Sequence, residues 1–248
     1  MEPINIICPN FGPLAVVGDR LHDGYDFVVR SNSRSDTLDY LIFLDSRGIS
    51  RGFEGSIADK LITQIAQGGG TYLLLCRPLE LTTWATLINF IVINKLNLSK
   101  IVTNMGFVDF TPKKLSTLQD AVQQVDFFIG KDVANSCFVQ SFESSSGEMI
   151  PLYSMCYGDT YRKSIETIAK RLPTLIVNTP LVDDGIRIDR KRPHAFFSAL
   201  ANSNEFNRSI NGAQVVDLPH FDETLTYDAV HYTTLGNEVI FDSIKDYI

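Results

Sequence analysis

A serine, an asparagine, an aspartate and a histidine stand in this 248-residue chain where they can form an acyl-transfer site. Ser46 and Asn104 each follow a short apolar run, and Asp228 lies three residues before His231 near the C-terminus. Serine needs a base to become a nucleophile. A histidine base needs a carboxylate that fixes its tautomer, and a tetrahedral intermediate needs donors aimed at its oxyanion. These residue types therefore indicate nucleophilic acyl transfer.

Each of these residues also has a purely structural interpretation. Ser46 can cap a helix that follows a strand, and Asn104 can stabilise a turn, where asparagine is favoured. Asp228 can cap the last helix, which is compatible with orienting His231. The order along the chain, with Ser46 early and the Asp228–His231 pair before the last helix, favours the catalytic interpretation.

Alternating strands and helices are expected to bring these residues together. The expected strands are Tyr40–Leu44, Tyr72–Cys76, Lys100–Thr103, Thr174–Val177 and Ala213–Val216, and the expected helices are Ile57–Ala66, Thr82–Leu96, Leu115–Phe128, Tyr157–Arg171, Pro193–Asn207 and Thr233–Ile248. This alternation predicts an α/β fold, a flavodoxin-like three-layer α/β/α sandwich with a five-stranded parallel sheet. Sites on such sheets lie at the carboxyl ends of the strands, which is where Ser46 and Asn104 stand.

The length favours a single domain over residues 1–248. Residues 1–37 do not fit the strand–helix repeat, and we expect them to form an N-terminal extension with short extra strands at the sheet edge. Residues 130–151 lack periodicity and are expected to form a long loop or hairpin insertion, a feature that is uncommon unless it is functional.

Three short blocks of the chain resemble the SGNH/GDSL hydrolase family, a family of serine esterases. Leu44-Asp45-Ser46-Arg47 is similar to the block that carries the family's serine, and Val102-Thr103-Asn104-Met105 to the block that carries its asparagine. Asp228-Ala229-Val230-His231 is similar to the final D-x-x-H block, which is the most specific of the three. The resemblance covers roughly residues 38–248 and implies Ser46, Asp228 and His231 as a catalytic triad.

The resemblance also implies an oxyanion hole, and here the chain departs from the family. Leu44 replaces the usual glycine before Asp-Ser, and Asn104 lacks the flanking glycine and aspartate. No clear glycine follows the second expected strand, where Arg77 occupies the position and Pro78 has no N–H to donate. The implied hole therefore combines the Ser46 backbone N–H, the Asn104 side chain and the Arg77 backbone N–H.

Two arginines and a phenylalanine follow strands at the expected ligand-binding edge. Arg47 and Arg77 are candidates for binding an anionic group of the substrate, because a guanidinium pairs with a carboxylate in a fork geometry. A surface salt bridge is the alternative for each of them. Phe107 begins a Phe-Val-Asp-Phe run that can line a pocket or anchor a loop.

Composition limits the partners. The formal net charge of −7 lacks the basic excess of nucleic-acid-binding domains, so nucleic acid is not expected as a partner. The N-terminus shows no signal-peptide pattern and no apolar stretch is long enough to span a bilayer, so a cytoplasmic location is expected. The four cysteines form no C-x-x-C pair and are expected to be buried free thiols.

The sequence therefore predicts a serine hydrolase that acts on a small-molecule or glycan ester, with no metal and no organic cofactor. By the family resemblance, the substrate is expected to be a small acyl ester such as an O-acetyl group on a carbohydrate. An O-acyltransferase with the same site, a non-catalytic carbohydrate-binding module on the same fold and a nucleotide-binding enzyme remain as alternatives.

Overall fold

The structure is a computed structural model of the whole chain. The residues that it describes are 4–8, 12–16, 27–33, 35, 37–50, 52–77, 82–111, 138–143, 147–153, 159–183, 186–187, 192 and 194–248. The expected helix at 115–128 lies outside them.

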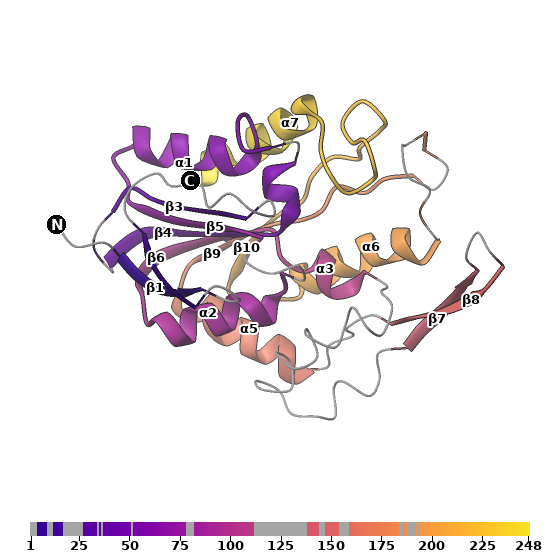
Figure 1. Cartoon of the computed structure of the whole chain (residues 1–248), viewed down its shortest axis with the longest axis horizontal. Helices are drawn as coiled ribbons and strands as arrows, with labels where there is room; N and C mark the ends of the chain where they lie inside the picture. Colours follow the sequence, from indigo (N-terminus) through magenta and orange to yellow (C-terminus); the bar gives the residue numbers. More distant parts are fainter. Residues whose placement is uncertain are drawn as a thin grey trace.

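A mixed sheet of six strands forms the centre of the molecule (Figure 1). Its strands, in spatial order, are β10 (Ala213–Val216), β9 (Thr174–Val177), β6 (Asn97–Thr103), β4 (Thr37–Leu44), β5 (Tyr72–Cys76) and β3 (Val28–Ser31). Neighbouring strands from β10 to β5 pair in parallel, whereas β3 pairs antiparallel with β5. The predicted α/β class is confirmed.

The sheet has six strands where the sequence predicts five parallel strands with short extra strands at the edge, because β3 adds an antiparallel strand beside β5. Val28 and Val29 of β3 are buried, and their strand covers the backbone edge that β5 would otherwise leave unpaired. An antiparallel edge strand on an otherwise parallel sheet is common in α/β folds.

Helices cover both faces of this sheet. Helices α1 (Ile57–Gln67) and α7 (Thr234–Ile244) lie on one face, and α2 (Trp84–Asn94) and α5 (Asp159–Arg171) lie on the other (Figure 1). The short helix α3 (Phe107–Phe110) lies beside α6 (His194–Arg208), and two 3₁₀ helices, η1 (Ser46–Ile49) and η3 (Lys245–Tyr247), complete the helical elements of the described residues. Thr83 begins α2 with a reciprocal capping box.

Two antiparallel strand pairs form separate two-stranded sheets. Strands β1 (Ile4–Cys8) and β2 (Gly12–Val16) pair with each other, and the Asn94 side chain of α2 bonds both backbone groups of Ile7. Strands β7 (Phe138–Glu143) and β8 (Met149–Tyr153), which overlap the expected insertion at 130–151, pair at a distance from the sheet (Figure 1).

The apolar side chains of the strands pack into two cores, one on each face of the sheet. Leu41 and Phe43 of β4 belong to the cluster that contains Trp84 of α2, whereas Ile42 belongs to the cluster that contains Leu61 of α1. Alternate residues of one strand point to opposite faces, so a strand covered on both faces is apolar throughout. Within the described residues, no helix is long and apolar enough to cross a membrane.

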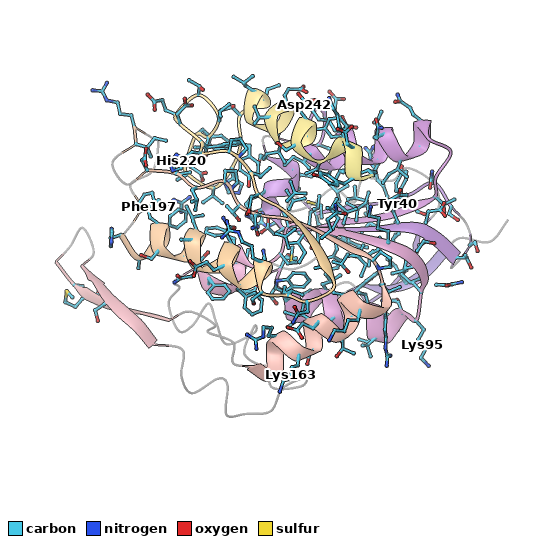
Figure 2. The ribbon with its side chains drawn as sticks, turned by 180° about the vertical axis from the view of Figure 1, so that it is seen from behind. Tyr40, Lys95, Lys163, Phe197, His220 and Asp242 are labelled. Atoms are coloured by element: carbon cyan, nitrogen blue, oxygen red, sulfur yellow. The ribbon has the colours of Figure 1, made fainter. Side chains whose placement is uncertain are left out.

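The two ends of the sheet differ in character. Tyr40, near the start of β4, lies toward one end of the molecule, and Phe197 and His220 lie toward the other (Figure 2). The second end carries the carboxyl ends of the parallel strands, where the sequence predicts the site.

Candidate active site

Ser46 is presented by a tight turn at the carboxyl end of β4. The carboxylate of Asp45 caps η1 by accepting the backbone N–H of Arg47 at 2.9 Å, and Ser46 is the first residue of this 3₁₀ helix. Gly48 fits the turn because a Cβ there would lie 2.7 Å from Leu44 Cβ and 2.9 Å from Cys76 Sγ. The local sequence therefore fixes the position of Ser46 through its neighbours on both sides.

His231 is presented by a second turn, which an aspartate also shapes. Asp228 Oδ1 accepts the backbone N–H groups of Val230 at 3.0 Å and of His231 at 2.7 Å. Ala229, inside this turn, has φ 64°, a left-handed conformation that costs a non-glycine residue about 1–2 kcal/mol. Thr226 Oγ1 donates to the His231 carbonyl at 2.8 Å, so the turn is held from both sides of the strained residue.

The two turns bring the predicted triad together. Ser46 Oγ lies 3.1 Å from His231 Nε2, and His231 Nδ1 lies 2.9 Å from Asp228 Oδ2. An ionised carboxylate accepts only, so we assign the proton of the neutral imidazole to Nδ1, and Nε2 is then the acceptor for the Ser46 hydroxyl. This is the hydrogen-bond chain that serine acyl transfer uses.

Asp228 is held in its ionised form. Burial raises its pKa, but the hydrogen bonds from the side chain and backbone of His231 outweigh burial and lower the pKa to about 2. The carboxylate therefore remains an acceptor for His231 across the neutral range.

An arginine that the sequence does not single out completes the surroundings of Asp228. Arg192 Nη2 donates to Asp228 Oδ2 at 2.9 Å, and Arg192 Nε donates to the Asp228 backbone carbonyl at 3.1 Å. Both side chains are largely buried, with 12% and 14% of their surfaces exposed. Since Arg192 stands 36 residues before Asp228, in no recognisable motif, no sequence signal could have paired them.

The predicted substrate-binding role of Arg47 is wrong. Its side chain is fully buried, and its guanidinium forms a salt bridge of 2.6 Å with Asp45. It also donates to the Asn104 carbonyl and to Thr179 Oγ1, residues that follow β6 and β9. Arg47 therefore ties together the carboxyl ends of three strands, because a guanidinium carries five donors in a fixed plane.

Tyr232 connects this buried cluster to the histidine turn. The charge of Arg47 acts on its buried hydroxyl, and burial raises the pKa of Tyr232 to about 12. Tyr232 directly follows His231, so the contact joins the segment that carries the base to the turn that carries Ser46. The opposing rings of Phe221 and Tyr232 pack edge-on, with centroids 5.7 Å apart.

Arg77 and Asn104, the predicted oxyanion donors beyond Ser46, differ in their hydrogen-bond partners. The backbone N–H of Arg77 donates to the Leu44 carbonyl at 2.7 Å, so its predicted role as an oxyanion donor is wrong. Asn104 is buried beside the serine turn, where its Oδ1 accepts the Asp45 N–H at 2.9 Å and its Nδ2 donates to Asp45 Oδ1 at 3.1 Å. The Nδ2 atom of a primary amide carries two N–H groups, and these two bonds use only one of those of Asn104.

Phe107 does not line the site. It is 4% exposed, its ring packs edge-on against Phe196 with centroids 5.3 Å apart, and the Arg47 guanidinium lies over its other side. Its predicted role in substrate binding is therefore wrong, because the run that begins at Phe107 forms a buried helical turn, α3, in place of a pocket wall.

A cavity of about 490 Å³ opens beside Ser46 and His231. It is lined by Ser46, Ile49, Ser50, Gly52, Arg77, Tyr227 and His231. The Tyr227 ring stacks on the His231 imidazole, with centroids 5.9 Å apart and planes 18° apart. Arg77 has φ 51°, a left-handed backbone that is unusual for a residue with a side chain and that recurs at functional sites.

A larger cavity, about 640 Å³, lies at the opposite end of the strands, lined by Tyr40, the glycines at 68–70 and Lys100 among others. The smaller cavity is the one that Ser46 and His231 line. Among the described residues, no three His, Cys, Asp or Glu side chains are placed to hold a metal ion.

Comparisons with known proteins give no family and only distant structural likenesses. No family model and no curated protein matches the chain. Among solved structures, a GDSL-like protein from Parabacteroides merdae is 12% identical, with a TM-score of 0.43, over 85% of this chain and 95% of that one. A family two carbohydrate esterase from Clostridium thermocellum is 10% identical, with a TM-score of 0.41, over 86% and 64%. An acetyl xylan esterase from Butyrivibrio proteoclasticus is 9% identical, with a TM-score of 0.38, over 85% and 63%.

Proposed function

We propose that this chain is a serine ester hydrolase with Ser46, His231 and Asp228 as its catalytic triad. The observation that carries the proposal is the hydrogen-bond chain from Ser46 Oγ through both ring nitrogens of His231 to Asp228, with contacts of 3.1 and 2.9 Å. Ser46 and His231 stand 185 residues apart, so the fold, and not local sequence, creates their contact.

The reaction proceeds through an acyl-enzyme. Ser46 Oγ attacks the ester carbonyl carbon while His231 Nε2 takes the hydroxyl proton. The tetrahedral intermediate collapses, the bond from carbon to the leaving oxygen breaks, and His231 gives its proton to the departing alcohol. Water then attacks the acyl-serine with His231 as base, which releases the acid and restores Ser46. Asp228 orients the ring and stabilises the imidazolium in both halves.

The oxyanion hole of this proposal has two donors in place of the three that the family resemblance implies. Ser46 begins η1, so its backbone N–H has no partner within that helix. The second N–H of the Asn104 amide is the other donor. Asp45 bonds both polar atoms of the Asn104 side chain, Oδ1 and Nδ2. This fixed orientation supports Asn104 as a preorganised donor, the kind that stabilises an oxyanion best.

The proposed substrate is a small acyl ester, such as an O-acetyl group on a carbohydrate. The O-acetyl assignment comes from the resemblance of the serine and histidine blocks to SGNH/GDSL hydrolases. The cavity supports a polar substrate, because Ser50, Arg77 and Tyr227 are among its lining residues. In this proposal Arg77 binds an anionic or strongly polar part of the substrate.

The experiment compares the natural chain with Ser46→Ala for hydrolysis of p-nitrophenyl acetate. The natural chain is expected to hydrolyse the ester and to react covalently with a fluorophosphonate, and Ser46→Ala to lose both activities with an unchanged thermal unfolding midpoint. Ser209→Ala, at an exposed position directly after α6, is the matched control and is expected to keep both. Labelling that persists in Ser46→Ala contradicts the assignment.

A further inference from the structure

We infer that Arg192 is a positioning residue that holds Asp228 in the geometry His231 requires and sets, through its charge, the pH range in which His231 acts as a base. The inference rests on the proposed function, because it concerns the same triad. It adds a residue that lies outside the three sequence blocks and far from all of them in the chain.

The contacts of Arg192 fix both ends of Asp228. Its Nη2 donates to the Oδ2 atom that also faces His231, and its Nε donates to the Asp228 backbone carbonyl. Arg192 itself is held from the other side by Phe196 of α6, whose ring centroid lies 4.9 Å from the guanidinium carbon. A planar guanidinium anchored in this way restricts the carboxylate to one orientation.

The backbone beside this contact is strained. The carbonyl that Arg192 binds belongs to the residue before Ala229, which has φ 64°. Left-handed residues persist only where the surroundings fix them. The Arg192 bond on one side, and the N–H groups of Val230 and His231 bonded to Asp228 on the other, supply that restraint.

The charge of Arg192 acts on the base in a definite direction. Within the part of the chain that the structure describes, the polar groups that face His231 besides Asp228 include Ser46 Oγ and the stacked Tyr227 ring, and Arg77 lines the same cavity. Arg192 neutralises part of the Asp228 charge, so the carboxylate attracts the second proton of His231 less strongly. Removal of the cation is therefore expected to move the acid limb of the reaction to higher pH.

The experiment measures the rate of fluorophosphonate labelling against pH in the natural chain, Arg192→Gln and Arg192→Lys. Arg192→Gln is expected to move the acid limb of the labelling rate upward by roughly half a pH unit or more. It is also expected to lower the rate at the optimum roughly ten-fold, because the carboxylate loses its anchor. Arg192→Lys is expected to restore the acid limb but only part of the rate, because an ammonium lacks the fork of a guanidinium.

Arg208→Gln is the matched control. Arg208 lies on α6 and pairs with Asp217 at 2.9 Å on the surface, with 47% and 52% of the two side chains exposed. It is expected to leave the rate and its pH dependence unchanged. Thermal unfolding of each variant shows whether it is folded. If Arg192→Gln does not fold, Arg192→Lys still tests the inference through its labelling rate.

Two results overturn the inference and are distinguishable from each other. If the natural chain is labelled and Arg192→Gln keeps its acid limb, Arg192 is a structural residue only, and the proposed function stands. If the natural chain is not labelled at any pH, the proposed function fails, and the inference fails with it.

Discussion

Two Asp–Arg pairs flank the candidate site, and they differ in what the aspartate does with its second oxygen. In both turns one oxygen accepts the backbone N–H of a residue shortly after the aspartate. At Asp45 the remaining contacts go to Arg47 and Asn104, so the carboxylate serves the architecture. At Asp228 the second oxygen faces His231, so the carboxylate serves the proposed chemistry.

Burial separates the two pairs further. The side chains of Asp45 and Arg47 are 2% and 0% exposed, whereas those of Asp228 and Arg192 are 14% and 12% exposed. A fully buried charge depends on its partner, because an unpaired charge in the interior is costly. The buried pair is therefore expected to control stability, and the pair at the rim to control activity.

The largest expected effect is on the activity of Asp228→Asn. An amide holds the imidazole in the wrong tautomer, and we expect ester hydrolysis to fall about 10⁴-fold, as such substitutions do in serine proteases. The measurement is kcat on p-nitrophenyl acetate. Asp217→Asn, in the surface pair with Arg208, is the matched control and should keep its activity. Near-normal turnover by Asp228→Asn would assign the orienting role elsewhere.

The next effect is on the stability of Arg47→Met. This variant leaves Asp45 buried without its cation and removes the donors to Asn104 and Thr179. We expect the free energy of unfolding to fall by about 3–5 kcal/mol, measured by urea denaturation.

The matched control for this experiment is Arg208→Met, which breaks an exposed pair and is expected to cost about 1 kcal/mol or less. Equal losses in the two variants would show that the buried pair has no special structural role, and the contrast between the two aspartates would then be lost.

A smaller effect is expected from Tyr232→Phe, which removes the hydroxyl that links the two regions. Loss of the interaction of this hydroxyl with the charged Arg47 is expected to cost about 1 kcal/mol. The hydroxyl also makes stability depend on pH. Since burial raises the Tyr232 pKa to about 12, its contribution is complete below pH 10 and is lost as pH rises toward 12.

Denaturation series at pH 8 and pH 11 measure both effects of Tyr232→Phe. The natural chain should lose stability between these values, and the variant should lose less, because it lacks this titrating group. An equal loss in both proteins would mean that other groups determine the alkaline limit.

The sequence was sufficient for most of the central fold. All five strands expected from apolar runs are present, because strands covered on both faces are apolar throughout and stand out from their surroundings. Strand β3 lies within residues 1–37, where the sequence predicts short extra edge strands, but neither its partner nor its direction could be read from the sequence. Edge pairing depends on which backbone edge the rest of the fold leaves open.

The site was predictable where residue type and strand position suffice. Ser46, Asp228 and His231 meet as expected, because each stands beside an element whose place the repeat determines. Arg47 and Arg77 show the limit of this reasoning. Both follow strands, yet the side chain of Arg47 turns into the interior and the backbone N–H of Arg77 bonds to the neighbouring strand end.

The direction of a side chain after a strand depends on the turn, and the turn depends on tertiary contacts. Gly48 allows the serine turn to approach Leu44 and Cys76 closely, and in this turn the Arg47 side chain points into the interior. Arg192 was missed for a related reason, because its contact with Asp228 is made by the fold alone.

The most direct test of the account is to locate the fluorophosphonate adduct by peptide mass spectrometry. The account predicts one adduct, on the peptide that contains Ser46, formed in the natural chain and strongly reduced in His231→Ala. An adduct on another residue, or a Ser46 adduct that forms equally fast without His231, would contradict the claim that the two turns build one catalytic centre.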